Sequence, residues 1–145
     1  MIEENRWKHI LAVAQKAKKL ATKFKPNDNK FAEDMFLLGL LHDIGYEFSE
    51  DSLNHASIGG EILKRNNYKY WQEVALHSDE TVEYMTDKLF ILNCADIMIG
   101  INGEEFTFDE RLENVAGRYG KNELYKKCLI AIERLKTDRR YTKIS

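Results

Sequence analysis

Cysteine and proline are scarce in this sequence of 145 residues. The two cysteines, Cys94 and Cys128, do not have the spacing of a thiolate metal site or a redox motif, and they suit a reducing cytosolic compartment. One disulfide between them stays open at this stage. The single proline and the eight glycines only separate helical patterns, and no repeat, low-complexity tract or linker is visible. The sequence therefore predicts one domain, residues 1–145.

Long apolar runs and an excess of one charge are also lacking. The longest apolar run, MFLLGLL, is far too short to span a bilayer, and the N-terminus MIEENRWKHI is too polar for a signal peptide. A net charge of -2 gives no sign of a nucleic-acid polymer or a membrane as partner. We therefore expect a cytoplasmic protein that binds neither, and its oligomeric state stays open.

Helical periodicity predicts an all-α fold. Apolar residues recur at helical spacing from about Glu3 to Phe24, with Trp7 among them, and Pro26 ends this helix. No alternating strand pattern competes elsewhere. The further helices that we expect span residues 55–65, 70–77, 81–99 and 107–119, the last of these opened by the capping box TFDE, and a final stretch carries Leu124 to Leu135.

The second predicted helix is the most apolar. One of three polar residues at positions 27–29 caps its N-terminus, and the helix is apolar nearly all round from Met35 to about Ile44. This pattern is typical of a central, buried helix. We expect Gly45 to end it in a left-handed conformation, and Gly39 to leave room beside Asp43.

The end of this helix, GLLHDIGY, places a histidine and an aspartate in an apolar segment, where an unpaired charge is costly to bury. Helical spacing aims four more polar side chains at the core, from four other predicted helices. Singly, each is typical of a hydrogen-bonded core residue or a capping group. Together they need a shared cation, because so small a core does not offer each a neutral partner. The six are His9, His42, Asp43, His55, His77 and Asp96.

The ligand types narrow the choice of metal. Imidazole and carboxylate without thiolate suit iron, manganese, cobalt, nickel or zinc, and argue against a structural thiolate-zinc site. We expect one or two divalent transition-metal ions, with iron or manganese favoured, to compensate the buried Asp43.

This order of histidines and aspartates resembles the HD-domain superfamily of metal-dependent phosphohydrolases. The resemblance is carried by GLLHDIGY, by the helical histidine upstream of it and by CADIM downstream. The stretch ADIMIGINGEEFTFDERLENVAGRYG is similar to the C-terminal part of small bacterial HD-domain proteins, which tend to carry the His-Asp-Ile-Gly-Tyr form of the motif. The resemblance covers Trp7 to about Gly120, and it implies a bundle of six or seven helices with a metal at its centre.

The resemblance also implies roles for the six residues. Members with the minimal site would use His9, His42, Asp43 and Asp96 around one metal. Members with two further histidines bind a second metal, with the motif aspartate as bridge, and here those histidines are His55 and His77. This arrangement resembles that of bacterial dinucleoside tetraphosphate hydrolases and cyclic-dinucleotide phosphodiesterases, although the extended glycine and proline signature of the latter is lacking. His42 and Asp43 are then the catalytic residues.

Substrate contacts are expected at Arg111 and Arg118, which suit bidentate phosphate binding or, alternatively, form surface ion pairs with neighbouring glutamates. Tyr46 either closes over the pocket or packs. Many HD-domain proteins carry a phosphate-binding lysine near this position, whereas here Gly45 is followed by Tyr46 and Glu47.

The predicted function is a metal-dependent phosphohydrolase that acts on a nucleotide or another small phosphorylated metabolite through a metal-activated hydroxide. An HD-domain di-iron oxygenase is the alternative, since some members use the same six-ligand arrangement for oxygen chemistry. A third hypothesis is a catalytically silent nucleotide-binding module, and the intact ligand set weighs against it.

Overall fold

The structure, a computed structural model, describes residues 2–49 and 54–145. These residues form seven α-helices and two short 3-10 helices, and their only β-type pairing is an isolated bridge between Ile99 and Glu105. The prediction of an all-α fold is confirmed. In chain order the helices are α1 (Glu4–Phe24), α2 (Asn29–Leu41), η1 (Ile44–Glu47), α3 (His55–Arg65), α4 (Trp71–Leu76), α5 (Asp87–Met98), α6 (Phe108–Tyr119), α7 (Glu123–Thr137) and η2 (Arg139–Lys143).

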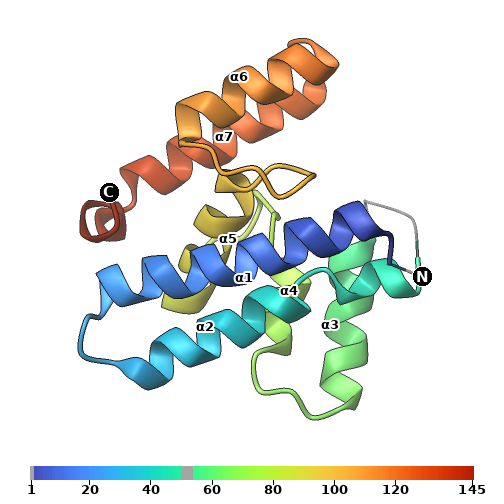
Figure 1. The fold of residues 1–145 in the computed structure, drawn as a ribbon, viewed down its shortest axis with the longest axis vertical. Helices are drawn as coiled ribbons and strands as arrows, with labels where there is room; N and C mark the ends of the chain where they lie inside the picture. Colours follow the sequence, from blue (N-terminus) through green and yellow to red (C-terminus); the bar gives the residue numbers. More distant parts are fainter. Residues whose placement is uncertain (1, 50–53) are drawn as a thin grey trace.

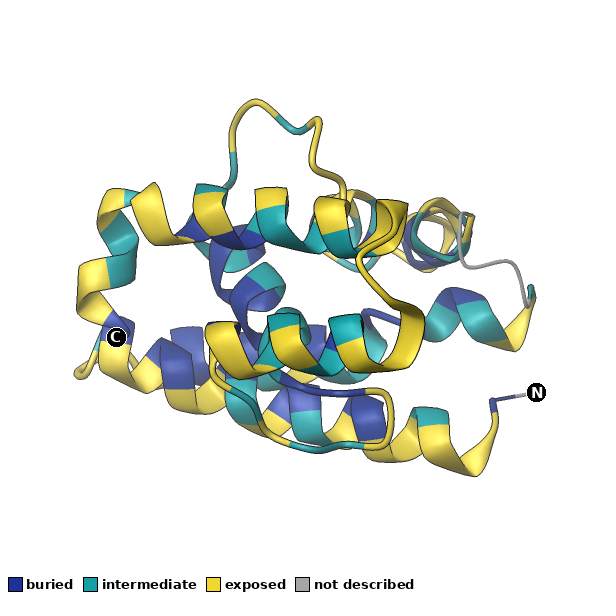
Figure 2. Cartoon of the chain, turned by 90° about the horizontal axis from the view of Figure 1, so that it is seen from above, coloured by how far each residue is buried: buried dark blue, intermediate teal, exposed yellow. Residues whose placement is uncertain are grey.

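Helix α5 lies at the centre of the bundle. It contacts α1, α2 and α4, and it also contacts α6 and α7. Figure 1 shows α1 and α2 on one side of α5, with α6 and α7 packed together on the other. Buried residues follow the inward faces of the helices, and the outward faces are largely exposed (Figure 2). The central helix can therefore carry a polar side chain into a site surrounded by other helices.

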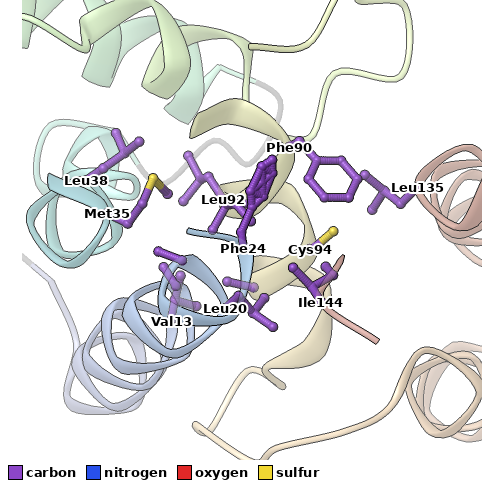
Figure 3. Packing of buried hydrophobic residues seen from close by; sticks show 14 of the residues in the cluster. Val13, Leu20, Phe24, Met35, Leu38, Phe90, Leu92, Cys94, Leu135 and Ile144 are labelled. Atoms are coloured by element: carbon purple, nitrogen blue, oxygen red, sulfur yellow. The ribbon is translucent and has the colours of Figure 1, made fainter. Parts of the chain in front are cut away.

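The hydrophobic core joins the N-terminal and C-terminal helices. Phe90 and Leu92 of α5 are completely buried, and burying side chains of this kind contributes about 1.5–3 kcal/mol each. Figure 3 shows these residues packed together with Val13, Leu20 and Phe24 of α1, Met35 and Leu38 of α2, Cys94 of α5, Leu135 of α7 and Ile144. The single domain predicted for residues 1–145 stays a prediction, and the core contacts of Leu135 and Ile144 agree with it.

Polar caps explain where several helices begin. Asp28 accepts a hydrogen bond from the backbone of α2, Thr86 from that of α5 and Asn122 from that of α7. At α6 the predicted capping box is confirmed, because Thr107 and Glu110 each accept a hydrogen bond from the other's backbone N–H. These caps satisfy N–H groups that have no partner within their own helix.

Three expectations about the end of the second helix and the two glycines near it are wrong. The helix ends at Leu41 instead of Ile44, and Gly45 lies in η1 without a left-handed φ. Its role is close approach, because a Cβ on Gly45 would lie 1.8 Å from the carbonyl oxygen of His55 in α3. Gly39 makes room for α1 and not for Asp43, since its Cβ would lie 2.6 Å from the Cα of Ala14.

Helix α2 and helix α1 are also less buried than their sequences indicate. Leu37 is 46% exposed, so α2 is not surrounded by protein on all sides. Trp7 is 53% exposed and Leu11 is 49% exposed, because the buried stripe of α1 passes through His9, Ile10 and Val13. Trp7 is therefore not a core residue.

The fifth helix begins at Asp87, six residues later than predicted. Thr86 caps it, and the preceding segment is held in a non-helical path by two arginines from the C-terminal part of the chain. Arg134 donates to the carbonyl oxygens of Glu80 and Glu83, and Arg140 donates to that of Met85. Contacts distant in sequence thus replace the helical hydrogen bonds that the local pattern favours.

Both cysteines are free, so the disulfide left open by the sequence is not formed. Within residues 2–49 and 54–145, no helix combines the length and the hydropathy that a bilayer span requires.

Candidate metal centre

Five helical elements bring the six polar residues of the predicted site together. His9 comes from α1, Asp96 from α5 and His55 from the first turn of α3, while the other three follow directly on helix ends. His42 and Asp43 follow α2, and His77 follows α4. His9, His42, Asp43 and His77 are almost completely buried. The apolar segment GLLHDIGY therefore does carry its histidine and aspartate into the interior.

Asp43 presents its two carboxylate oxygens to two different groups of histidines. Its Oδ2 lies 3.2 Å from Nε2 of His42 and 3.7 Å from Nε2 of His9. Its Oδ1 lies 3.3 Å from Nε2 of His55 and 3.4 Å from Nε2 of His77. One carboxylate thus lies between two halves of the cluster, which is the position of a bridging ligand.

Asp96 completes the first half of the cluster. Its Oδ1 lies 2.9 Å from Nε2 of His9 and 3.3 Å from Nε2 of His42. Two sets of ligand atoms, each within 4.8 Å of one another, have a spacing that can hold a metal ion. One set is His9, His42 and Asp96, and the other is His42, Asp43 and His77.

Backbone carbonyls fix the protonation of three of the rings. Nδ1 of His9 donates to the carbonyl oxygen of Gly100 (2.9 Å), Nδ1 of His42 to that of Gly39 (2.6 Å), and Nδ1 of His77 to that of Val74 (2.6 Å). A carbonyl oxygen can only accept, so each Nδ1 carries a proton. In the neutral rings each Nε2 is then a lone pair aimed at the cluster, which is how metal-binding histidines are oriented in proteins.

The converging lone pairs need a positive charge among them. Nε2 of His55 and Nε2 of His77 face each other at 3.1 Å. Nε2 of His42 is completely buried and has no hydrogen-bond partner among the described residues, although two carboxylate oxygens lie within 3.3 Å of it. A buried polar atom without a partner is rare and costly, and a metal ion at this point would satisfy it. The donor set therefore fits a divalent transition metal.

The close packing of carboxylates and imidazoles also shifts the pKa values of His42, Asp43 and Asp96. Burial alone would lower the pKa of His42, but the neighbouring carboxylates of Asp43 and Asp96 raise it well above its ordinary value. Burial would likewise raise the pKa of Asp43 and of Asp96, but the positive charge of His42 holds both well below their usual range. These shifts all have one cause, the close approach of two carboxylates to the imidazole of His42.

A serine outside the predicted set orients Asp96. The hydroxyl of Ser78 donates to Oδ2 of Asp96 (3.1 Å), which leaves Oδ1 to face the histidines. Ser78 itself has a left-handed φ of 64°, and its backbone N–H donates to Oδ1 of Asn93 (3.0 Å). A non-glycine residue in this region of φ is strained, and such strain often accompanies a functional site. Nothing in the sequence pattern singled out Ser78.

Tyr46 lies beside the cluster in a stack of three side chains. Its ring is parallel to that of His55, with a centroid distance of 4.3 Å and an interplanar angle of 16°. The guanidinium of Arg6 covers the ring of Tyr46 at 3.8 Å, and Nη1 of Arg6 lies 3.4 Å from Oδ2 of Asp43. Sequence reasoning missed Arg6, although it precedes His9 by one helical turn and so shares a face with it.

Arg111 and Arg118 each pair with a residue outside the six-residue cluster. Nη1 of Arg111 donates to Oδ1 of Asn114 (2.6 Å), and Nη2 of Arg118 lies 3.8 Å from a carboxylate oxygen of Glu104. Both arginines line a pocket of about 430 Å³, and Tyr46, His55 and Asp96 line the same pocket. The structure thus connects the predicted substrate contacts to the cluster through one cavity.

The fold and the cluster define a class of protein. A model of the HD-domain family matches residues 6–126, which is most of the chain, so the protein belongs to the HD-domain family. The HD domain is a superfamily of metal-dependent hydrolases, and this membership supports a general hydrolase activity for the chain. The comparisons with curated proteins and with solved structures found no significant match.

Proposed function

We propose that the protein is a metal-dependent phosphohydrolase that acts on a nucleotide or another small phosphorylated metabolite. One observation carries the proposal: the two oxygens of Asp43 face two groups of histidine Nε2 atoms, all in one buried cluster. A carboxylate shared in this way supports two metal ions, and two-metal sites are common among enzymes that cleave phosphoesters.

The six residues would hold the metal in two overlapping sets. His9, His42 and Asp96 form one, and Asp43 connects it to His55 and His77. A divalent metal bound there would supply Lewis acidity and would lower the pKa of a coordinated water toward about 7. Asp43 keeps the two halves at a fixed separation, and the hydrogen bond from Ser78 keeps Asp96 in its orientation.

Arg6 is placed to bind the phosphoryl group. Its side chain is 32% exposed, so part of the guanidinium faces solvent, while Nη1 stays 3.4 Å from Asp43. Stacking on Tyr46 holds the guanidinium plane in position. An arginine so placed can donate two parallel hydrogen bonds to a phosphate. Arg6 therefore takes the part for which many HD-domain proteins have a lysine near Gly45.

The proposal is tested with metal-free protein reconstituted with manganese, cobalt or ferrous iron. Phosphate release is measured from a panel of nucleotides and small phosphomonoesters, and we expect it to depend on added metal. Replacing Arg6 by alanine should lower kcat/KM about 10- to 100-fold, since a hydrogen bond to a charged group contributes about 1.5–3 kcal/mol. Arg65→Ala is the control, because Arg65 is exposed and forms an ion pair with Glu61 of the same helix, α3.

One outcome would favour the oxygenase alternative over the phosphohydrolase. If the panel releases no phosphate with any metal, while the reduced iron-loaded protein consumes oxygen in the presence of an organic substrate, the protein is an HD-domain oxygenase. If Arg6→Ala and Arg65→Ala behave alike, Arg6 does not bind the phosphoryl group.

A further inference from the structure

A pocket extends from the metal centre toward α6 and α7, and we call it the α6/α7 pocket. Its volume is about 430 Å³, within the range of about 300–1,000 Å³ that is typical of small-molecule sites. Tyr46, His55 and Asp96 of the metal centre line it, and so do Val115 of α6 and Leu135 of α7. A phosphoryl group at the metal centre would therefore have the rest of its molecule in this pocket.

The walls contributed by α5, α6 and α7 are largely apolar. Ile97, Val115 and Leu135 line the pocket, together with the smaller side chains of Cys128 and Ala131. Val115 and Leu135 are almost completely buried, and Leu135 belongs to the main hydrophobic core. A small phosphorylated acid without apolar groups would leave these apolar walls in contact with water. An apolar or aromatic group would instead be removed from water against them.

Cationic side chains form part of the same lining. Arg111 and Arg118 lie two helical turns apart on α6, and Lys127 comes from α7. Arg111 is hydrogen-bonded to the neutral amide of Asn114, so that contact does not neutralise its charge. Arg134 also lines the pocket, but its guanidinium is used to hold the carbonyl oxygens of Glu80 and Glu83. Asp79 and Glu80 also line the pocket, and Arg118 lies 3.8 Å from a carboxylate oxygen of Glu104, so Arg111 is the cation of α6 whose charge remains available.

From this juxtaposition we infer that the α6/α7 pocket binds the leaving part of the substrate, and that this part has an apolar or aromatic body and a second anionic group. The inference rests on the proposed hydrolase function for the placement of the phosphoryl group. It narrows the substrate from any small phosphorylated metabolite to those with such a body. Val115, Leu135 and Ala131 contact the body, and Arg111 binds the second anion.

A graded series of phosphomonoesters separates the contribution of the apolar or aromatic body from that of the second anionic group. Methyl phosphate has no body, phenyl phosphate has an aromatic body, and p-carboxyphenyl phosphate has the body and a second anion. For the metal-loaded protein, KM should fall at each step of the series, and kcat is left out of the comparison because the aromatic leaving groups are intrinsically better than methanol. Arg111→Gln should raise KM about tenfold for p-carboxyphenyl phosphate and leave phenyl phosphate unchanged, since only the former has a carboxylate to bind.

Filling the pocket tests the apolar body. Ala131→Phe should lower kcat/KM at least tenfold for both aromatic esters and leave methyl phosphate unchanged. Ile130→Phe is the matched control, because Ile130 is the neighbouring residue on α7, is 54% exposed and does not line the pocket. Equal effects of Ala131→Phe on all three esters, or no effect on any, would overturn the inference.

A binding measurement keeps this result independent of catalysis. Both cysteines are free, Cys94 is completely buried and Cys128 lines the pocket, so alkylation by N-ethylmaleimide reports on Cys128. We expect p-carboxyphenyl phosphate to slow this alkylation at least fivefold and methyl phosphate to have no effect. Protection without phosphate release supports the pocket and contradicts the hydrolase. Phosphate release without protection supports the hydrolase and contradicts the pocket.

Discussion

Oδ1 of Asp96 lies 2.9 Å from Nε2 of His9, although 87 positions separate the two residues in the chain. This contact joins α5 to α1 at the centre of the bundle, where Asp43 and three more histidines also converge. The candidate metal centre is therefore a product of tertiary packing, and changes in packing near it should alter metal binding as directly as changes in the ligands.

The hydrogen bond from Ser78 to Asp96 should strengthen metal binding without being essential to the fold. Ser78→Ala removes the donor, and removing a group that orients a ligand typically costs 10- to 100-fold in metal affinity. We expect this loss of metal affinity in Ser78→Ala, measured by competition with a chromophoric chelator. The unfolding temperature should change little. Ser57→Ala is the control, because Ser57 is exposed in the first turn of α3 and its hydroxyl donates to the carbonyl oxygen of Asn54.

A second variant at Ser78 separates the orienting effect of its hydroxyl on Asp96 from the backbone strain at Ser78 itself. Ser78→Gly also removes the hydroxyl, but glycine adopts the φ of 64° without strain. The glycine variant should therefore lose the same metal affinity as the alanine variant and unfold at a higher temperature than it. Retention of full affinity in either variant would show that Ser78 does not orient Asp96.

Gly45 should be irreplaceable even though its φ is ordinary. A Cβ at Gly45 would lie 1.8 Å from the carbonyl oxygen of His55, so Gly45→Ala has to push α3 away from η1 and move His55 with it. We expect a loss of about 1–3 kcal/mol in the free energy of unfolding, together with weaker metal binding.

The control for this variant is Gly117→Ala in α6. A Cβ at Gly117 meets nothing within 4 Å, and alanine is favoured over glycine in a helix by about 0.5–1 kcal/mol. Urea unfolding should therefore show opposite signs for the two substitutions. A Gly45→Ala protein as stable as the wild type would mean that η1 and α3 are not in close contact.

Much of this site was predictable because its signals are local. His42 and Asp43 are adjacent in a strongly apolar stretch, and Thr107 with Glu110 forms a capping box that needs no distant partner. The roles of Gly39 and Gly45 were not predictable, since they depend on Ala14 and His55 from other helices. Each of these glycines looks like a helix feature in the sequence and acts as a point of close approach in the fold.

The residues around the ligands were harder to find for the same reason. Arg6 has a sequence signal, because it stands one helical turn before His9. Ser78 has none, since its φ and its contact with Asp96 follow from how α4 leads into the segment before α5. The late start of α5 depends on Arg134 and Arg140, which lie more than fifty residues downstream of the carbonyl oxygens that they bind.

Metal uptake should release protons, most of all from His42. The pKa of His42 lies well above its ordinary value, so at neutral pH the metal-free site holds a proton that a metal has to displace. Raising the pH removes that proton, and metal affinity should therefore increase with pH from about 6 upward. Calorimetry in two buffers of different ionisation enthalpy measures the number of protons released. An affinity that does not change with pH would contradict the assignment of His42 as a ligand.

The second half of the cluster should be separable from the first. Replacing His55 or His77 by alanine should weaken the binding of one metal ion. The other ion should stay bound, because its ligands His9, His42 and Asp96 remain. Metal analysis after gel filtration should show about two equivalents in the wild type and about one in each variant. A wild type that never exceeds one equivalent, or a complete loss of metal in both variants, would rule out the two-metal arrangement.

The most direct test of the proposed metal centre measures metal content and phosphate release on the same samples of the wild type and of Asp43→Asn. The substitution keeps the shape of the side chain and removes the charge that faces both groups of histidines, while Asp34→Asn removes a carboxylate that pairs with Lys30 and Lys88 outside the cluster. The proposed metal centre predicts that Asp43→Asn loses its bound transition metal and its phosphate release together, with the fold intact by circular dichroism, and that Asp34→Asn loses neither. Full metal occupancy in Asp43→Asn, or phosphate release that persists without metal, would contradict it.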